Sequence, residues 1–247
     1  MSDINQASRK DEIECIQVDQ IPKIKGIIFD LDGTLANTIQ SIIYSVEHVF
    51  GERQITPPTY EQYRSIFGYG ARNFGKDAFA LTGHKLTAEE AEEVYQRYMY
   101  YFDQFCCHQV EVYPRLPQAL LELQNQGVKM AVLSNKPDVQ AKKVVDFCFA
   151  PYGINFAVVQ GLRDDLPRKP DPSVALAIAE KLQLQPQQMA FVGDGDTDVQ
   201  TGINAGMLAV GVTWGFRSAE QLREHGAQII MHSPDALEQF VRDCQNF

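Results

Sequence analysis

Two aspartates follow a short apolar run near the start of the chain, in the sequence KGIIFDLDGTL at residues 25–35. The apolar residues 27–29 lead into Asp30, and Asp32 comes two residues later, just before Gly33 and Thr34. Isolated carboxylates at the end of a buried strand are very costly unless they are paired or bound to a metal. A binding or catalytic role therefore explains this segment better than packing does.

Other polar residues also fall directly after apolar segments that we predict to be strands. Ser134 and Asn135 follow residues 129–133, and Asp194 follows residues 189–192. In an open parallel sheet, ligands bind outside the carboxyl ends of the strands. We therefore expect one cluster that contains Asp30, Asp32, Ser134, Asn135, Asp194, Asp198, and Lys169 from the loop DLPRKPDP.

Acids combined with one lysine and one hydroxyl make a poor structural cluster, but they suit a hard cation together with a phosphate. Magnesium takes carboxylate and carbonyl oxygens and is usually shared with the phosphate of a substrate. The metal and Lys169 can neutralise a phosphoryl group that a carboxylate must approach. The cluster therefore favours Mg²⁺ as cofactor and a small phosphorylated molecule as ligand.

The second half of the chain alternates predicted strands and helices, which is typical of a parallel, doubly wound sheet. The predicted strands are residues 25–31, 129–133, 156–159, 189–192, 208–213 and 228–231. The predicted helices between and after them are residues 116–126, 139–149, 172–182, 199–205, 218–224 and 234–243.

Residues 39–107 show only helical periodicity, interrupted by Pro57 and Pro58 and by a glycine-containing loop at 68–70. One helix there begins after Thr87, with Glu90 completing a capping box. We interpret this block as an all-helical cap inserted over the strand ends of a Rossmann-like α/β core. The expected domains are an N-terminal extension at 1–22, the core at 23–36 and 111–247, and the cap at 37–110.

Composition limits the possible partners and the cellular location. The net charge of −10, from 22 basic and 32 acidic residues, argues against nucleic acid or an anionic membrane as partner. Five cysteines without a C-x-x-C pair predict free thiols and a reducing compartment. The polar N-terminus lacks an apolar signal core, and no stretch has the roughly 20 apolar residues of a membrane span. We expect a cytoplasmic protein.

The motifs DLDGTL, LSN, RKPDP and GDGDTD follow, in this order, the four motifs of haloacid dehalogenase superfamily phosphatases. The resemblance covers about residues 25–215, and the helical insert resembles the small helical cap of that superfamily. The phosphoglycolate phosphatase and β-phosphoglucomutase branch is the most similar. The resemblance implies a magnesium-dependent phosphatase, monomeric or homodimeric, that hydrolyses a small phosphorylated metabolite, with phosphoglycolate as the first candidate.

The same resemblance implies a role for each residue of the motifs. Asp30 is the expected nucleophile, which forms an aspartyl-phosphate, and Asp32 is the expected general acid and then base. Magnesium is expected on the carboxylates of Asp30 and Asp194 and on the backbone carbonyl of Asp32. Lys169 offsets charge, while Asp198 orients this lysine or completes the outer metal shell. The substrate-binding residues are expected to be Ser134, Gly33, Thr34, Asn135 and, from the cap, Arg72.

Several alternatives stay open at this point. A phosphosugar mutase of the β-phosphoglucomutase type would use the same nucleophile, and an inactive phosphate-binding module would need a broken motif, which the chain lacks. Arg72 is either a substrate contact or a plain surface arginine. The chain departs from the family pattern at Asn37, the hinge into the cap, and at Gly195, beside the metal site. The cap aromatic residues are interpreted as cap core, namely Tyr95, Tyr98, Tyr101 and Phe102.

Overall fold

The computed structural model describes residues 12–16 and 23–245. Its centre is a seven-stranded sheet in the order β1-β9-β8-β7-β2-β5-β6, in which every neighbouring pair is parallel except β1 with β9. The strands are β1 (Ile13–Cys15), β2 (Gly26–Phe29), β5 (Lys129–Pro137), β6 (Val158–Leu162), β7 (Met189–Gly193), β8 (Leu208–Val212) and β9 (Ile229–Met231).

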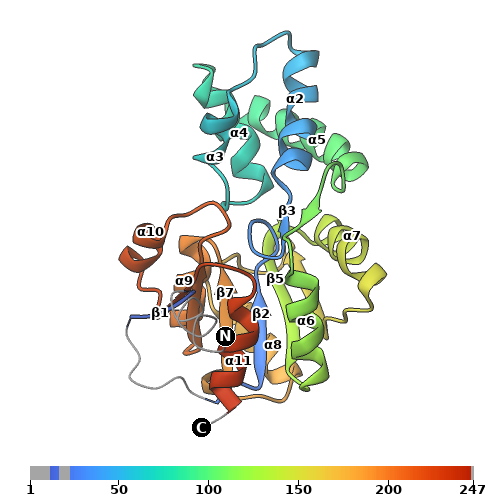
Figure 1. Cartoon of the computed structure of the whole chain (residues 1–247). Coiled ribbons are helices and arrows are strands. Elements are labelled where there is room, and N and C mark those ends of the chain that lie inside the picture. The colour runs from blue at the N-terminus through green and yellow to red at the C-terminus, as the bar shows by residue number, and fades with distance from the viewer. Residues whose placement is uncertain (1–11, 17–22, 246–247) are drawn as a thin grey trace, which may run out of the picture.

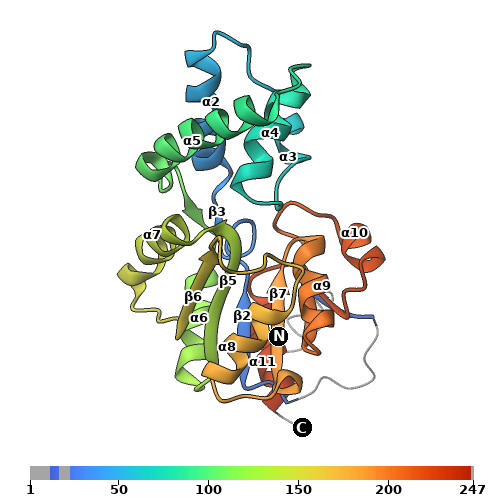
Figure 2. The same ribbon diagram turned by 180° about the vertical axis from the view of Figure 1, so that it is seen from behind.

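Helices cover both faces of this sheet, as the alternating pattern predicted. Successive residues of β2 point to opposite faces, so Ile27 and Phe29 belong to one apolar cluster and Ile28 to another. Figures 1 and 2 show α6 and α11 in front of the sheet from one side and α8 and α9 from the other. The core helices are α6 (Leu116–Asn125), α7 (Asp138–Phe149), α8 (Ser173–Lys181), α9 (Asp196–Asn204), α10 (Ala219–Glu224) and α11 (Ala236–Gln245).

Four helices form a separate group beyond one edge of the core, joined to it at the two-residue strands β3 (Ala36–Asn37) and β4 (Glu111–Val112). These helices are α2 (Ile39–Glu52), α3 (Tyr60–Arg64), α4 (Ala71–Leu81) and α5 (Ala88–Phe105). Thr87 caps α5 with the predicted capping box to Glu90. The fold class, a doubly wound α/β sheet with a helical cap, is confirmed, whereas the exact domain boundaries stay a prediction.

Three local differences from the prediction matter for the site or the sheet. Residues 13–15 add an antiparallel edge strand, which polar flanking sequence concealed. Strand β5 continues four residues beyond the predicted end, and so it carries Ser134 and Asn135 itself. Helix α9 begins at Asp196, three residues early, because Gly195 and Asp198 cap its first turn. Among the described residues, no helix is long and apolar enough to cross a membrane.

Candidate active site

The turn after β2 places the two aspartates. The backbone N–H groups of Thr34, Leu35 and Ala36 all reach the carbonyl of Leu31, at 3.3, 3.0 and 3.1 Å. Gly33 has a φ of 88°, and a side-chain carbon there would overlap the Asp194 carboxylate. Only glycine therefore lets this turn pass so close to Asp194.

Lys169 is the cation beside Asp30. Its ammonium lies 2.6 Å from Asp198 Oδ1, to which it donates a hydrogen bond, and 2.8 Å from Asp30 Oδ1. All three side chains are almost fully buried. Burial alone lowers the pKa of Lys169, but the charges of Asp198 and Asp30 outweigh it and raise that pKa overall. The lysine is therefore a permanent positive charge at this point.

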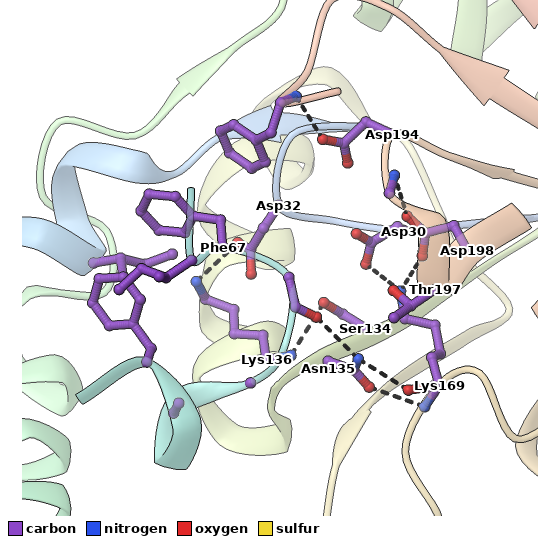
Figure 3. A pocket seen from close by; sticks show the side chains of 18 of the residues that line it. Asp30, Asp32, Phe67, Ser134, Asn135, Lys136, Lys169, Asp194, Thr197 and Asp198 are labelled. Atoms are coloured by element: carbon purple, nitrogen blue, oxygen red, sulfur yellow. Dashed lines mark hydrogen bonds and ion pairs between the residues drawn. The ribbon is translucent and has the colours of Figure 1, made fainter. Parts of the chain in front are cut away.

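The carboxylates of Asp30, Asp194 and Asp198 form a buried cluster, with oxygen atoms within 4.8 Å of one another (Figure 3). Burial, and then the nearby charge of Asp198, raises the pKa of Asp30 to about 7. The same two causes, in the same order, raise the pKa of Asp194, although it accepts hydrogen bonds from Thr34 Oγ1 and the Phe216 N–H. This part of the site therefore holds more negative charge than its surroundings neutralise.

These residues fit a magnesium ion. Asp30 Oδ1 is fully buried and finds no hydrogen-bond partner among the described residues, and its contact with the Lys169 ammonium is an ion pair. The charge of Asp198 is already offset, since one of its oxygens accepts from the Lys169 ammonium and the other from the Gly195 N–H at 2.9 Å, whereas both donors to Asp194 are neutral. Oxygen donors with uncompensated charge are what Mg²⁺ requires, and Asp30 and Asp194 offer them.

Asp32 lies apart from this cluster and has different partners. Lys136 donates to Asp32 Oδ1 at 2.9 Å, and Thr38 Oγ1 donates to the same oxygen at 2.5 Å. The Asp32 side chain remains 19 % exposed. Figure 3 shows Lys136 directed at Asp32, away from the group formed by Asp30, Asp194 and Asp198. The two acids of one motif thus occupy unlike environments.

Lys136 and Thr38 were not predicted from the sequence. Lys136 stands two residues after Ser134 in LSNKP, and the period of the extended strand β5 would have placed both on one face. Thr38 was hidden at the boundary between β3 and α2. Asn37, a departure from the family pattern, accepts a hydrogen bond from the Ile39 N–H at 3.3 Å and so supports the start of α2.

The pocket over these residues combines polar groups with an apolar lining. Ser134, Asn135 and Lys169 from the core line it, together with the cap-loop residues Gly68 and Gly70. Its apolar lining comes from cap and core alike and includes Ile42, Ile66, Phe67, Phe74, Tyr98, Phe102 and Phe216. Tyr98 and Phe102 are thus cap core, as predicted, and also face the pocket.

Several expected substrate contacts are placed elsewhere. Arg72 pairs with Glu92 on the cap surface and lies over the Tyr95 ring at 4.0 Å, with its side chain 58 % exposed. It does not line the pocket, because its neighbours on the surface already bind it. Gly33 and Thr34 support the turn and Asp194 and are likewise absent from the lining.

The Asn135 side chain also has a structural task, since it binds the backbone of the neighbouring loop. Its Oδ1 accepts from the Lys169 N–H at 3.0 Å, and its Nδ2 donates to the Gly68 carbonyl at 3.2 Å. One residue thereby connects strand β5 with the lysine loop and with the cap.

Comparison with known proteins identifies the family. A family model described as haloacid dehalogenase-like hydrolase matches residues 27–212. The chain belongs to this hydrolase family. The phosphoglycolate phosphatase of Haemophilus influenzae is 30% identical over 208 residues, which cover 82% of this chain and 91% of the relative.

A second relative and a crystal structure agree with this placement. The N-acetylmuramic acid 6-phosphate phosphatase of Pseudomonas aeruginosa is 26% identical over 227 residues, covering 90% of this chain and 98% of the relative. A predicted phosphoglycolate phosphatase from Haemophilus somnus superposes with a TM-score of 0.80 at 24% identity, covering 91% of this chain and all of the other. At that identity the superposition demonstrates the shared fold.

Proposed function

We propose that this phosphatase of the haloacid dehalogenase-like family hydrolyses a small phosphorylated metabolite with Mg²⁺ and an aspartyl-phosphate intermediate. Phosphoglycolate is the first candidate substrate, because a phosphoglycolate phosphatase is among the relatives that match most of the chain. The proposal rests chiefly on one observation: Asp30 Oδ1 is buried in the pocket with no hydrogen-bond partner among the described residues, beside the cation Lys169 and the acid Asp194.

The metal would be held by Asp30 and Asp194, together with the backbone carbonyl of Asp32. When bound, it supplies positive charge to the phosphoryl oxygens as negative charge develops there. Lys169, which Asp30 and Asp198 hold in place, adds a second positive charge. Ser134, buried in the pocket wall, offers a hydroxyl to the phosphoryl group.

In the first step, a carboxylate oxygen of Asp30 attacks phosphorus, the bond from phosphorus to the alcohol oxygen breaks, and Asp32 donates a proton to that oxygen. In the second step, Asp32 takes a proton from water while the water oxygen attacks phosphorus and releases Asp30. The separate position of Asp32, held by Lys136 and Thr38, supports this division of tasks. The apolar side chains that line the pocket limit access of water until the alcohol leaves.

The test combines a nucleophile variant with metal removal. We expect Asp30→Asn to lower phosphate release from phosphoglycolate by about 10³-fold or more, because no covalent path remains. A chelator should abolish wild-type turnover, and added Mg²⁺ should restore it. Asp146→Asn, an exposed position on α7, is the matched control and should keep the wild-type rate.

Mass spectrometry of acid-quenched enzyme should detect one phosphoryl group on wild-type Asp30 and none in the variant. A rate unaffected by Asp30→Asn or by chelation contradicts the proposal. Formation of an isomer from a sugar phosphate without free phosphate points to the mutase instead.

A further inference from the structure

In the part of the chain that the structure describes, three cations line the pocket, and they differ in how fully they are paired. Lys169 contacts two carboxylates, Asp30 and Asp198. Arg217 donates to the Phe67 carbonyl at 3.3 Å and lies 3.8 Å from Asp196. Among the described residues, the Lys136 ammonium has a single hydrogen-bond acceptor, Asp32 Oδ1. Both Lys136 and Arg217 therefore keep unused N–H donors, and Lys136 is the one of the two that contacts Asp32.

The unused N–H donors of Lys136 lie in a buried environment. Its side chain is 1 % exposed, and its ammonium lies 4.6 Å from the centre of the Phe102 ring of the cap. An ammonium has three N–H donors, of which Asp32 takes one and the ring face stabilises the charge. A buried cation is costly when it is incompletely paired. The environment thus favours a second anion from outside the chain.

We propose that Lys136 binds an anionic group on the alcohol part of the substrate, and that the enzyme selects phosphoesters whose alcohol carries a carboxylate. This inference rests on the proposed function, in which Asp32 protonates the leaving alcohol. A cation 2.9 Å from Asp32 lies beside that alcohol rather than beside the phosphoryl group. Lys169 serves the phosphoryl end, and Lys136 serves the other end.

A merely structural role for Lys136 would be to position Asp32. The two roles give different results because Thr38 also positions Asp32, through Oδ1, without carrying a charge. If Lys136 only held Asp32, its loss would slow every substrate alike, as the loss of Thr38 should. If it binds the alcohol's carboxylate, its loss should slow only substrates that carry one.

The experiment compares kcat/KM for 2-phosphoglycolate and for 2-hydroxyethyl phosphate, which replaces the carboxylate by a neutral hydroxymethyl group. We expect the wild type to prefer phosphoglycolate by about 10²-fold or more, as expected for a site built around a buried charged contact. Lys136→Met should reduce this ratio to within about threefold of unity, whereas Lys136→Arg, which keeps the cation, should retain most of it.

Two control variants complete the design. Thr38→Val should lower both kcat/KM values by a similar factor and keep the ratio. Lys142→Met removes an exposed lysine of α7 and should change neither value. Should Lys136→Met fail to fold, Lys136→Gln, which keeps a polar end group, takes its place in the same comparison.

The outcomes separate the two proposals. A wild-type ratio that persists in the uncharged Lys136 variants overturns the assignment of Lys136. So does a wild type that hydrolyses 4-nitrophenyl phosphate but shows no preference between the two substrates, and in that case the proposed phosphatase function stands. If the wild type hydrolyses no phosphoester at all with Mg²⁺ present, the proposed function fails, and the inference fails with it.

Discussion

The replacement Asp30→Asn should inactivate the enzyme and at the same time make the metal-free protein more stable. Burial, and then the charge of Asp198, raises the pKa of Asp30 from its ordinary value of 3.8 to about 7. Ionised Asp30 therefore destabilises the folded state but not the unfolded chain. At about pH 8 the difference between the two pKa values corresponds to about 4 kcal/mol, which asparagine removes because it carries no charge.

The sign of this effect fixes its pH dependence. Below the unfolded pKa, Asp30 is protonated in both states, and the variant should match the wild type. Between the two pKa values the folded wild type binds a proton that the unfolded chain has released, so its stability falls as the pH rises. The advantage of the variant should therefore grow to about 1–2 kcal/mol at about pH 5 and reach its full size above about pH 7.

Urea unfolding in the presence of a chelator, followed by circular dichroism at several pH values, measures this difference directly. Asp146→Asn serves again as the exposed control and should show no pH-dependent gain. Saturating Mg²⁺ should shrink the advantage, because the ion stabilises ionised Asp30 in the wild type. The reasoning is refuted if Asp30→Asn is no more stable than the wild type at about pH 8, or if its advantage is the same at every pH.

Two further predictions concern the metal site. Gly215→Ala should weaken the apparent Mg²⁺ affinity by about 10–100-fold, because the added carbon would overlap the Asp194 carboxylate without changing any charge. Gly51→Ala is the control, because a side-chain carbon there meets nothing within 4 Å. It should leave the Mg²⁺ affinity unchanged and stabilise α2 by up to about 1 kcal/mol. Equal Mg²⁺ affinities in both variants would count against Asp194 as a ligand. Mg²⁺ binding should also tighten between about pH 6 and pH 8 and release protons, since the pKa values of Asp30 and Asp194 are both raised. Calorimetry in two buffers of different ionisation enthalpy measures the protons released. A pH-independent affinity without proton release contradicts this prediction.

The sequence predicted those parts of the site that local patterns determine. An apolar run that ends in an acid marks a strand end, and parallel strands end at the same edge, so the meeting of Asp30 and Asp194 followed from periodicity. Lys169 was assigned to the same cluster from the loop that carries it. The buried acidic cluster contains Asp30 and Asp194 because each follows the end of a parallel strand. The fold class followed in the same way from alternating strand and helix segments.

The cap side of the site was less predictable, because it depends on contacts between distant segments. Arg72 was a reasonable candidate for the pocket from its loop, but α4 turns it toward Glu92, twenty residues later on α5. Lys136 and Thr38 meet at Asp32 from two different elements. The period of β5 places Lys136 on the face of Ser134 but does not show its contact with Asp32, and Thr38 has no local pattern that points there. Side-chain direction at a domain junction depends on how the domains pack, which periodicity does not encode.

The short turn after β2 explains how one motif serves two chemical tasks. If the strand continued, Asp30 and Asp32 would share one face, since strand residues two positions apart point the same way. The strand ends at Phe29, however, and the three N–H groups bound to the Leu31 carbonyl bend the chain at once. Asp30 therefore meets Lys169 in a buried acidic cluster, while Asp32 meets Lys136 under the cap. Carboxyl groups with such unlike surroundings can divide nucleophile and acid–base roles between them, and one short turn is enough to create that difference.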